Sequence, residues 1–226
     1  VITRLRKVIP QAQQVSREMA TGKKKVLVVF HQGRVGSTAL VDSISQNKDW
    51  EVYGEIFSGR PLYRKFTAYS LAVFGLSNFL KALFFVGRCK KVVLEIKVHQ
   101  LPYSINRLIQ EISKVKTKYD VSFLCLTRDP KNRALSELKA QKLKRYHFKV
   151  NESTGHSEIE LNERKQFKMN GLYGGVNFHA QVSQLEDFLI KRVFEVLDLE
   201  FVEINYEKDL KEDIRNGIKI INNSFN

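Results

Sequence analysis

This sequence is poor in the residues that build disulfide frameworks and metal sites. It has two cysteines in 226 residues, and its histidines, at positions 31, 99, 147, 156 and 179, include no pair at the spacing of helical metal ligands. We therefore expect neither a disulfide scaffold nor a bound metal. So few cysteines, with Cys125 inside a predicted core strand, favour a reducing cytoplasm.

Long apolar runs are scarce as well. The most apolar stretch, residues 69–87, contains Lys81 and two serines, which a membrane-spanning helix of about 20 apolar residues tolerates poorly. It predicts a buried or interfacial helix beside a ligand site, with peripheral membrane contact as the alternative. Because the sequence begins at Val1, the alternative compartment is the Golgi lumen, with the membrane anchor preceding this sequence. There the sequons at Asn151 and Asn222 would be glycosylated.

Positive charge is what the sequence has in excess. Its 38 lysines and arginines against 24 acidic residues give a formal net charge of +14, densest in residues 1–25 and 128–149. Such a protein attracts anions: a doubly phosphorylated nucleotide, an acidic glycan or a lipid head group. No signature of a nucleic-acid binding module accompanies the charge, so we expect no specific nucleic-acid partner.

Strand and helix patterns alternate along the chain. Apolar strand segments lie near residues 26–31, 51–54, 92–98, 121–127 and 200–205. This alternation predicts an α/β fold with three layers, αβα, around a central parallel sheet. We expect residues 1–24 to form a basic helix or tail and residues 25–226 a single domain, in which residues 142–166 form a long polar loop.

The most informative segment follows the first predicted strand, where residues 33–38 read Gly-Arg-Val-Gly-Ser-Thr and open a helix. The amides of a glycine turn and of the first helical residues, with Arg34, Ser37 and Thr38, form a cradle for a phosphate-like anion. A nucleotide triphosphatase loop would place a lysine before Ser37, where this chain has Gly36. The cradle therefore predicts an anion site without the usual triphosphate grip.

A second anion site is predicted where another strand ends. Arg128 follows the strand at 121–127, and Asp129 and Pro130 start a helix that carries Ser136. Ligands of open α/β sheets collect at the carboxyl ends of the strands. We therefore expect Arg128 and Ser136 to bind a second phosphate near the first.

These segments together resemble the sulfotransferases that use 3′-phosphoadenosine 5′-phosphosulfate (PAPS), over roughly residues 25–212. The family's Arg-x-Gly-Ser/Thr-Ser/Thr loop matches residues 34–38, and its arginine with a serine eight positions later matches Arg128 and Ser136. Residues 201–210 are similar to the family's strand followed by Tyr-Glu-Asp-Leu, with Lys208 inserted. The family's amphipathic helix before that strand is matched by apolar residues at helical spacing: Phe178, Val182, Leu185, Phe188 and Leu189.

The resemblance implies a P-loop-like sulfotransferase fold and a reaction. A sulfuryl group would move from PAPS to a hydroxyl acceptor, first a carbohydrate or glycolipid and otherwise a lipophilic alcohol or phenol, with PAP as product and no metal required. The 3′-phosphate would lie at Arg128 and Ser136. The residues implied at the 5′-phosphosulfate are Gly33, Arg34, Val35, Gly36, Ser37 and Thr38.

Two residues compete for the role of catalytic base. Lys97 and His99 look like the Lys-Thr-His-x-Pro of cytosolic sulfotransferases, in which the histidine is the base; Lys97 and Arg34 would then hold the sulfuryl oxygens. A neutral imidazole suits this task at physiological pH. Tyr53-Gly-Glu55 is similar to a segment of bacterial carbohydrate sulfotransferases whose glutamate is the proposed base, so Glu55 is the second candidate.

Two other classes of protein remain open. A nucleotide-kinase-like phosphotransferase is disfavoured, because no lysine precedes Ser37 and no acidic residue ends a strand as a magnesium ligand. A non-catalytic anion or nucleic-acid binding module would keep the cradle but would need no base at His99 or Glu55. The sequence predicts no oligomeric state.

Overall fold

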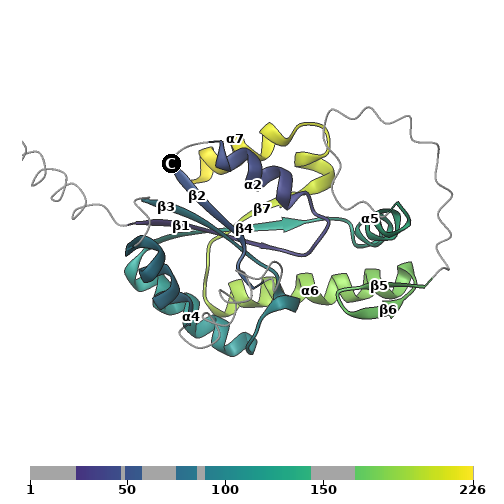
Figure 1. Cartoon of the computed structure of the whole chain (residues 1–226), viewed down its shortest axis with the longest axis horizontal. Coiled ribbons are helices and arrows are strands. Elements are labelled where there is room, and N and C mark those ends of the chain that lie inside the picture. The colour runs from purple at the N-terminus through teal and green to yellow at the C-terminus, as the bar shows by residue number, and fades with distance from the viewer. Residues whose placement is uncertain (1–23, 47–48, 58–74, 86–89, 144–165, 226) are drawn as a thin grey trace, which may run out of the picture.

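In the computed structural model, the described part of the chain comprises residues 24–46, 49–57, 75–85, 90–143 and 166–225. Its main sheet is fully parallel, in the order β2-β3-β1-β4-β7, and helices cover both faces (Figure 1). The prediction of a three-layer αβα fold is thus confirmed. The strands are β1 (Lys25–His31), β2 (Trp50–Glu55), β3 (Lys91–Ile96), β4 (Asp120–Thr127) and β7 (Val202–Asn205).

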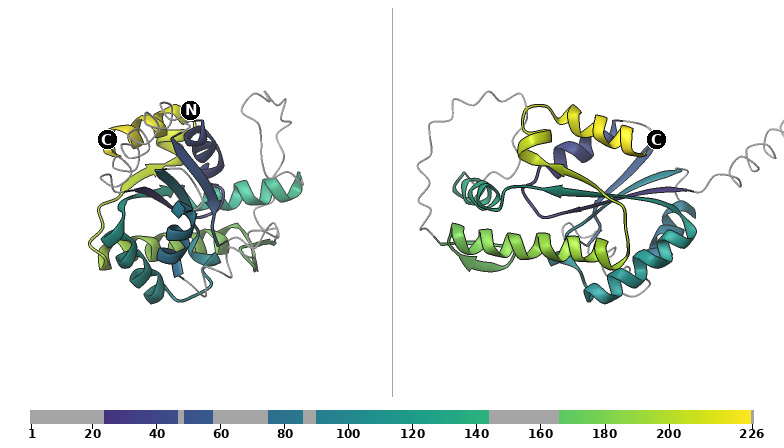
Figure 2. Two further views of the ribbon diagram at one scale, coloured as in Figure 1. Left: turned by 60° about the vertical axis from the view of Figure 1, so that its left-hand side comes forward. Right: turned by 180° about the vertical axis from the view of Figure 1, so that it is seen from behind.

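The central strands are apolar on both sides because both sides are covered, as parallel sheets require. In β1, Val26, Val28 and Phe30 pack toward α4 and α6, whereas Leu27 and Val29 pack toward α2 and α7. The right-hand view of Figure 2 shows the same layers from behind. The helices are α2 (Ser37–Ser45), α4 (Ile105–Lys118), α5 (Pro130–Lys142), α6 (Val176–Val196) and α7 (Ile214–Phe225).

The order of the strands creates a topological switch point. From β1 the chain turns to β2 and β3 on one side, whereas from β4 it continues to β7 on the other. Ligands of open α/β sheets bind at such a point, outside the carboxyl ends of the two strands. The loop after β1, residues 32–36, and the start of α5 after β4 therefore border the expected site.

A short hairpin between α5 and α6 was not predicted. It consists of β5 (Phe167–Met169) and β6 (Leu172–Gly174), joined by Asn170 and Gly171. Both turn residues have positive φ, 51° and 86°, which is the backbone that an Asn-Gly hairpin turn supplies. The expected polar loop at 142–166 lies almost entirely outside the described residues, as does the predicted tail at 1–24 except for its last residue.

Two apolar segments differ in burial. Residues 75–85 form a helix that buries Leu76, Leu80 and Phe84 in the core, as expected for the centre of the 69–87 stretch. On α6, by contrast, the predicted apolar stripe faces outward: Phe178, Leu185, Phe188 and Leu189 are exposed. No helix in the described part of the chain is long and apolar enough to span a membrane.

Candidate functional site

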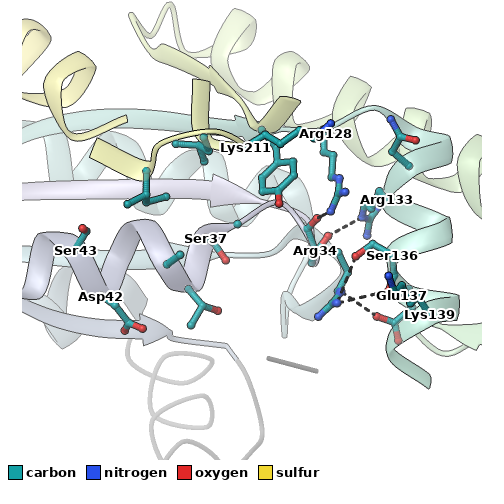
Figure 3. Close-up of a pocket in the computed structure, with 18 of the residues that line it drawn as sticks. Arg34, Ser37, Asp42, Ser43, Arg128, Arg133, Ser136, Glu137, Lys139 and Lys211 are labelled. Atoms are coloured by element: carbon teal, nitrogen blue, oxygen red, sulfur yellow. Dashed lines mark hydrogen bonds and ion pairs between the residues drawn. The ribbon is translucent and has the colours of Figure 1, made fainter. Parts of the chain in front are cut away.

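A cleft of about 1650 Å³ opens at the carboxyl ends of β1 and β4 (Figure 3). Its walls come from the loop after β1, the first turns of α2 and α5, the segment η2 (Tyr206–Leu210) and the start of α7. Both predicted anion-binding motifs line this one cleft. The residues contributed by the two motifs are Gly33, Arg34, Gly36, Ser37, Thr38, Arg128 and Ser136.

The loop after β1 bends through two residues with left-handed backbone. Arg34 has φ 67° and Gly36 has φ 79°, and Gly36 caps the N-terminus of α2. A Cβ at position 36 would lie 2.8 Å from the ring of Tyr206, so this position requires glycine for space as well as for conformation. Val35 is buried in the core and anchors the loop. The N-terminal amides of α2, which have no partners within the helix, lie at the cleft.

The two motifs contact each other directly. Nη2 of Arg34 donates to Oγ of Ser136 at 3.3 Å, and Nη1 of Arg128 donates to the carbonyl oxygen of Arg34 at 2.8 Å. In Figure 3 the Arg34 side chain reaches across the cleft toward Ser136, on α5. The residues predicted for the two anion sites therefore lie close together, whereas anion binding itself stays a prediction.

Carboxylates and an aromatic ring hold the two arginines in place. Glu137 lies 3.8 Å from Nε of Arg34, and Glu207 accepts from Nε of Arg128 at 3.1 Å. The Arg128 guanidinium also stacks 4.2 Å from the centre of the Tyr206 ring. Both cations are thus oriented at the rim of the cleft, and an anionic ligand would compete with these carboxylates for them.

Glu55 and Lys97 form an ion pair on the wall of the same cleft, with 2.6 Å between Oε1 and Nζ. Gln100 donates to the other carboxylate oxygen at 3.0 Å. Lys97 Nζ also lies 3.7 Å from where a Cβ at Gly33 would stand, which places this ammonium beside the anion-binding loop. Burial alone would raise the pKa of Glu55, but the attraction of Lys97 and the hydrogen bonds outweigh it, so the pKa is lowered.

His99 stands apart from the other predicted catalytic residues. It lies in the short helix η1 (Val98–Gln100) after β3, and its Nδ1 is 3.3 Å from Oε1 of Glu186 on α6. Within the described residues it does not line the cleft, whereas Glu55, Lys97 and Arg34 do. Three of the four predicted catalytic residues therefore line the cleft, and the fourth, His99, lies beside Glu186 outside the lining.

Several residues of the site were not predicted. Arg133 and Glu186 are buried polar residues next to the loop, and no local motif in the sequence indicates their partners. Tyr206 and Lys208 lie in η2, which is a single π-helical turn.

Among the described residues, no group of three or more His, Cys, Asp and Glu side chains could hold a metal ion. Cys125 is free and buried, and burial raises the pKa of its thiol to about 12, so it is not a nucleophile.

The geometry defines a parallel αβα fold with a glycine-containing loop and a helix N-terminus at its switch point. Neither a protein-family model nor a curated protein matches this sequence.

Solved structures similar to it include deoxyadenosine kinase from M. mycoides with bound dATP, at 15% identity and a TM-score of 0.45, covering 87% of this chain and 99% of that one. The YorR protein from Bacillus subtilis in complex with phosphorylated GDP has 11% identity and a TM-score of 0.44, covering 88% and 95%. A sulfotransferase from Alicyclobacillus acidocaldarius has 16% identity and a TM-score of 0.47, covering 87% and 80%. Similarities this distant do not specify an activity.

Proposed function

We propose that this protein is a PAPS-dependent sulfotransferase. The observation that carries the proposal is the contact between the two anion-binding motifs, in which Arg34 reaches Ser136 and Arg128 holds the backbone of Arg34. PAPS has phosphate groups on two different carbons of its ribose. Two adjoining sets of anion donors in one cleft suit such a ligand better than a nucleotide with one linear phosphate chain.

The reaction is an in-line displacement at sulfur. The acceptor oxygen forms a bond to sulfur while the bond between sulfur and the bridging oxygen of the 5′-phosphate breaks, and the hydroxyl proton passes to a base. Because the transition state is loose, the protein acts mainly by alignment and by stabilising charge. Arg34, Lys97 and the N-terminus of α2 are the donors near the transferred group in this proposal.

His99 is our first candidate for the base and Glu55 the second. Glu55 lies in the cleft, but its ion pair with Lys97 favours the carboxylate and lowers its pKa, which weakens it as a proton acceptor. His99 has a carboxylate at Nδ1, which leaves Nε2 as the proton acceptor. In this assignment Glu55 accepts a hydrogen bond from the acceptor hydroxyl or holds Lys97 in position.

A carbohydrate or glycolipid remains the proposed acceptor. The cleft, at about 1650 Å³, exceeds the 300–1,000 Å³ of common small-molecule pockets, so it has room for a nucleotide and a second substrate. Its polar and charged side chains suit hydroxyl-rich ligands better than a lipophilic phenol. Turnover of labelled PAPS against a panel of acceptors would identify the substrate.

Calorimetry with three ligands tests the proposal. PAP should bind at micromolar or better affinity, while ATP with magnesium and an oligonucleotide should bind much more weakly. Sulfuryl transfer should persist in excess EDTA. Tight binding of ATP and magnesium without PAP binding would replace the proposal with a nucleotide-kinase-like phosphotransferase, and preferential binding of the oligonucleotide would indicate a non-catalytic binding module.

A further inference from the structure

A buried polar network lies directly behind the anion-binding loop. Arg133 of α5 is 1% exposed, and its Nε donates to the carbonyl oxygen of Gly33 at 2.8 Å. Its Nη1 contacts the side-chain oxygen of Gln32. A guanidinium makes such paired contacts in one rigid plane, so Arg133 fixes the peptide just before Arg34.

The network continues onto α6. Nη1 of Arg133 donates to Oγ of Ser183 at 2.5 Å and lies 3.1 Å from Oε2 of Glu186. Gln32 donates to the carbonyl oxygen of Ser183 at 2.8 Å. These contacts explain why the inward face of α6 carries polar residues at this level while apolar ones face outward.

Glu186 connects this network to His99. Its Oε1 lies 3.3 Å from Nδ1 of His99 and accepts from Nδ2 of Asn170 at 3.1 Å. Burial tends to raise the pKa of Glu186, but the hydrogen bond from His99 and the charge of Arg133 outweigh it and lower the pKa. A carboxylate at Nδ1 selects the tautomer with its proton on Nδ1 and leaves the Nε2 lone pair free to accept a proton.

We propose that Arg133 and Glu186 are positioning residues, with Arg133 fixing the anion-binding loop and Glu186 fixing the ring and tautomer of His99. Because Arg133 and Glu186 form one buried ion pair, they fix the position of the anion-binding loop relative to the His99 ring. The catalytic consequence rests on the proposed sulfotransferase function, whereas the two structural effects do not.

The alternative is that the pair only stabilises the fold, and a double variant separates the two roles. Removing one member of a buried ion pair is strongly destabilising, whereas replacing both by apolar residues is often neutral. Arg133→Met should therefore lower the melting temperature, and Arg133→Met with Glu186→Leu should recover most of it.

Ligand binding should not recover with stability. We expect the double variant to bind PAP roughly 10- to 100-fold more weakly than the wild type, because nothing then fixes the carbonyl of Gly33. Glu195→Leu removes an exposed carboxylate from the other side of α6 and is the matched control. A double variant that regains both stability and wild-type PAP affinity would overturn the role of Arg133.

Nitrogen-15 NMR of the histidine rings tests the role of Glu186 without turnover. In the wild type, His99 should carry its proton on Nδ1, and Glu186→Leu should shift it toward the Nε2-protonated tautomer, with Glu186→Gln between the two. His179, whose Nε2 lies 2.9 Å from the carbonyl oxygen of Phe167, should stay Nε2-protonated in all three proteins.

If the tautomer of His99 is the same in Glu186→Leu as in the wild type, the inference is refuted. This measurement uses the protein without ligand, so it separates the two proposals. If the wild type binds no PAP but His99 responds to Glu186, the proposed function fails and the positioning role of Glu186 stands.

Discussion

The two walls of the cleft differ in how the chain builds them. The proposed anion-binding wall comes from two short segments, residues 33–38 and 128–136, each of which follows the end of a strand and contains a turn and the start of a helix. The catalytic wall contains Glu55 and Lys97. The third candidate, His99, lies outside the cleft lining and beside Glu186, which is 87 residues beyond it in the sequence. Local sequence therefore specifies the first wall, and the tertiary fold specifies the second.

The largest effect is expected at His99, the first candidate for the base. His99→Ala should lower turnover by about 10² to 10⁴ while leaving PAP affinity unchanged, because a general base contributes that much to the rate and His99 contacts neither anion motif. Glu55→Gln should mainly raise the acceptor KM. Steady-state kinetics with calorimetry would check both, and an active His99→Ala protein beside an inactive Glu55→Gln protein would exchange the two roles.

The same contrast explains how much the sequence predicted. The five strands followed from apolar runs and turn residues, which are local signals. That Arg128 and Ser136 lie near Arg34 followed from the rule that ligands collect at the carboxyl ends of strands, but the hydrogen bonds among them were not predicted. The outward orientation of the apolar stripe on α6 could not be predicted. A helical period identifies an apolar face, but it does not show that the opposite, polar face packs against buried polar residues such as Arg133. The β5–β6 hairpin did have a local signal, the turn sequence Asn170-Gly171, but each of its strands is only three residues long.

On the anion-binding wall, the effect of a substitution should depend on whether the ligand carries the 3′-phosphate. Arg128→Ala should weaken PAP binding roughly 10- to 150-fold, the loss expected for one charge-assisted hydrogen bond. Adenosine 5′-phosphosulfate lacks the 3′-phosphate, so its affinity should barely change. Calorimetry should then show that the affinities for PAP and for adenosine 5′-phosphosulfate differ less in the variant than in the wild type. Equal losses for both would mean that Arg128 acts through the fold of the loop.

Two glycines with left-handed backbone, Gly36 and Gly171, separate the effect of backbone conformation from that of close neighbouring atoms. Gly36→Ala places a Cβ against Tyr206 in a left-handed turn, whereas Gly171→Ala, at φ 86°, has no atom within 4 Å. The left-handed backbone should cost about 1 to 2 kcal/mol in each. Gly36→Ala should lose further stability and also PAP affinity. Thermal melts with calorimetry measure both, and identical melts with unchanged PAP binding would contradict the fit of Tyr206 over the loop.

The smallest expected effect is an acid-dependent one at Glu55. The pKa of Glu55 is lowered in the folded protein from its usual value of 4.5, so the stabilisation is fully present above that pH and is lost as the pH falls through the lower folded pKa. The melting temperature of the wild type should therefore fall more steeply below pH 4.5 than that of Glu55→Gln, which carries no such charge. Near pH 7 the variant should be the less stable of the two, because the Lys97 ammonium then lacks its partner. If the melting temperatures of the two proteins change with pH in the same way, the ion pair is broken in solution. Lys97 would then be free to meet the sulfuryl group without displacing a carboxylate.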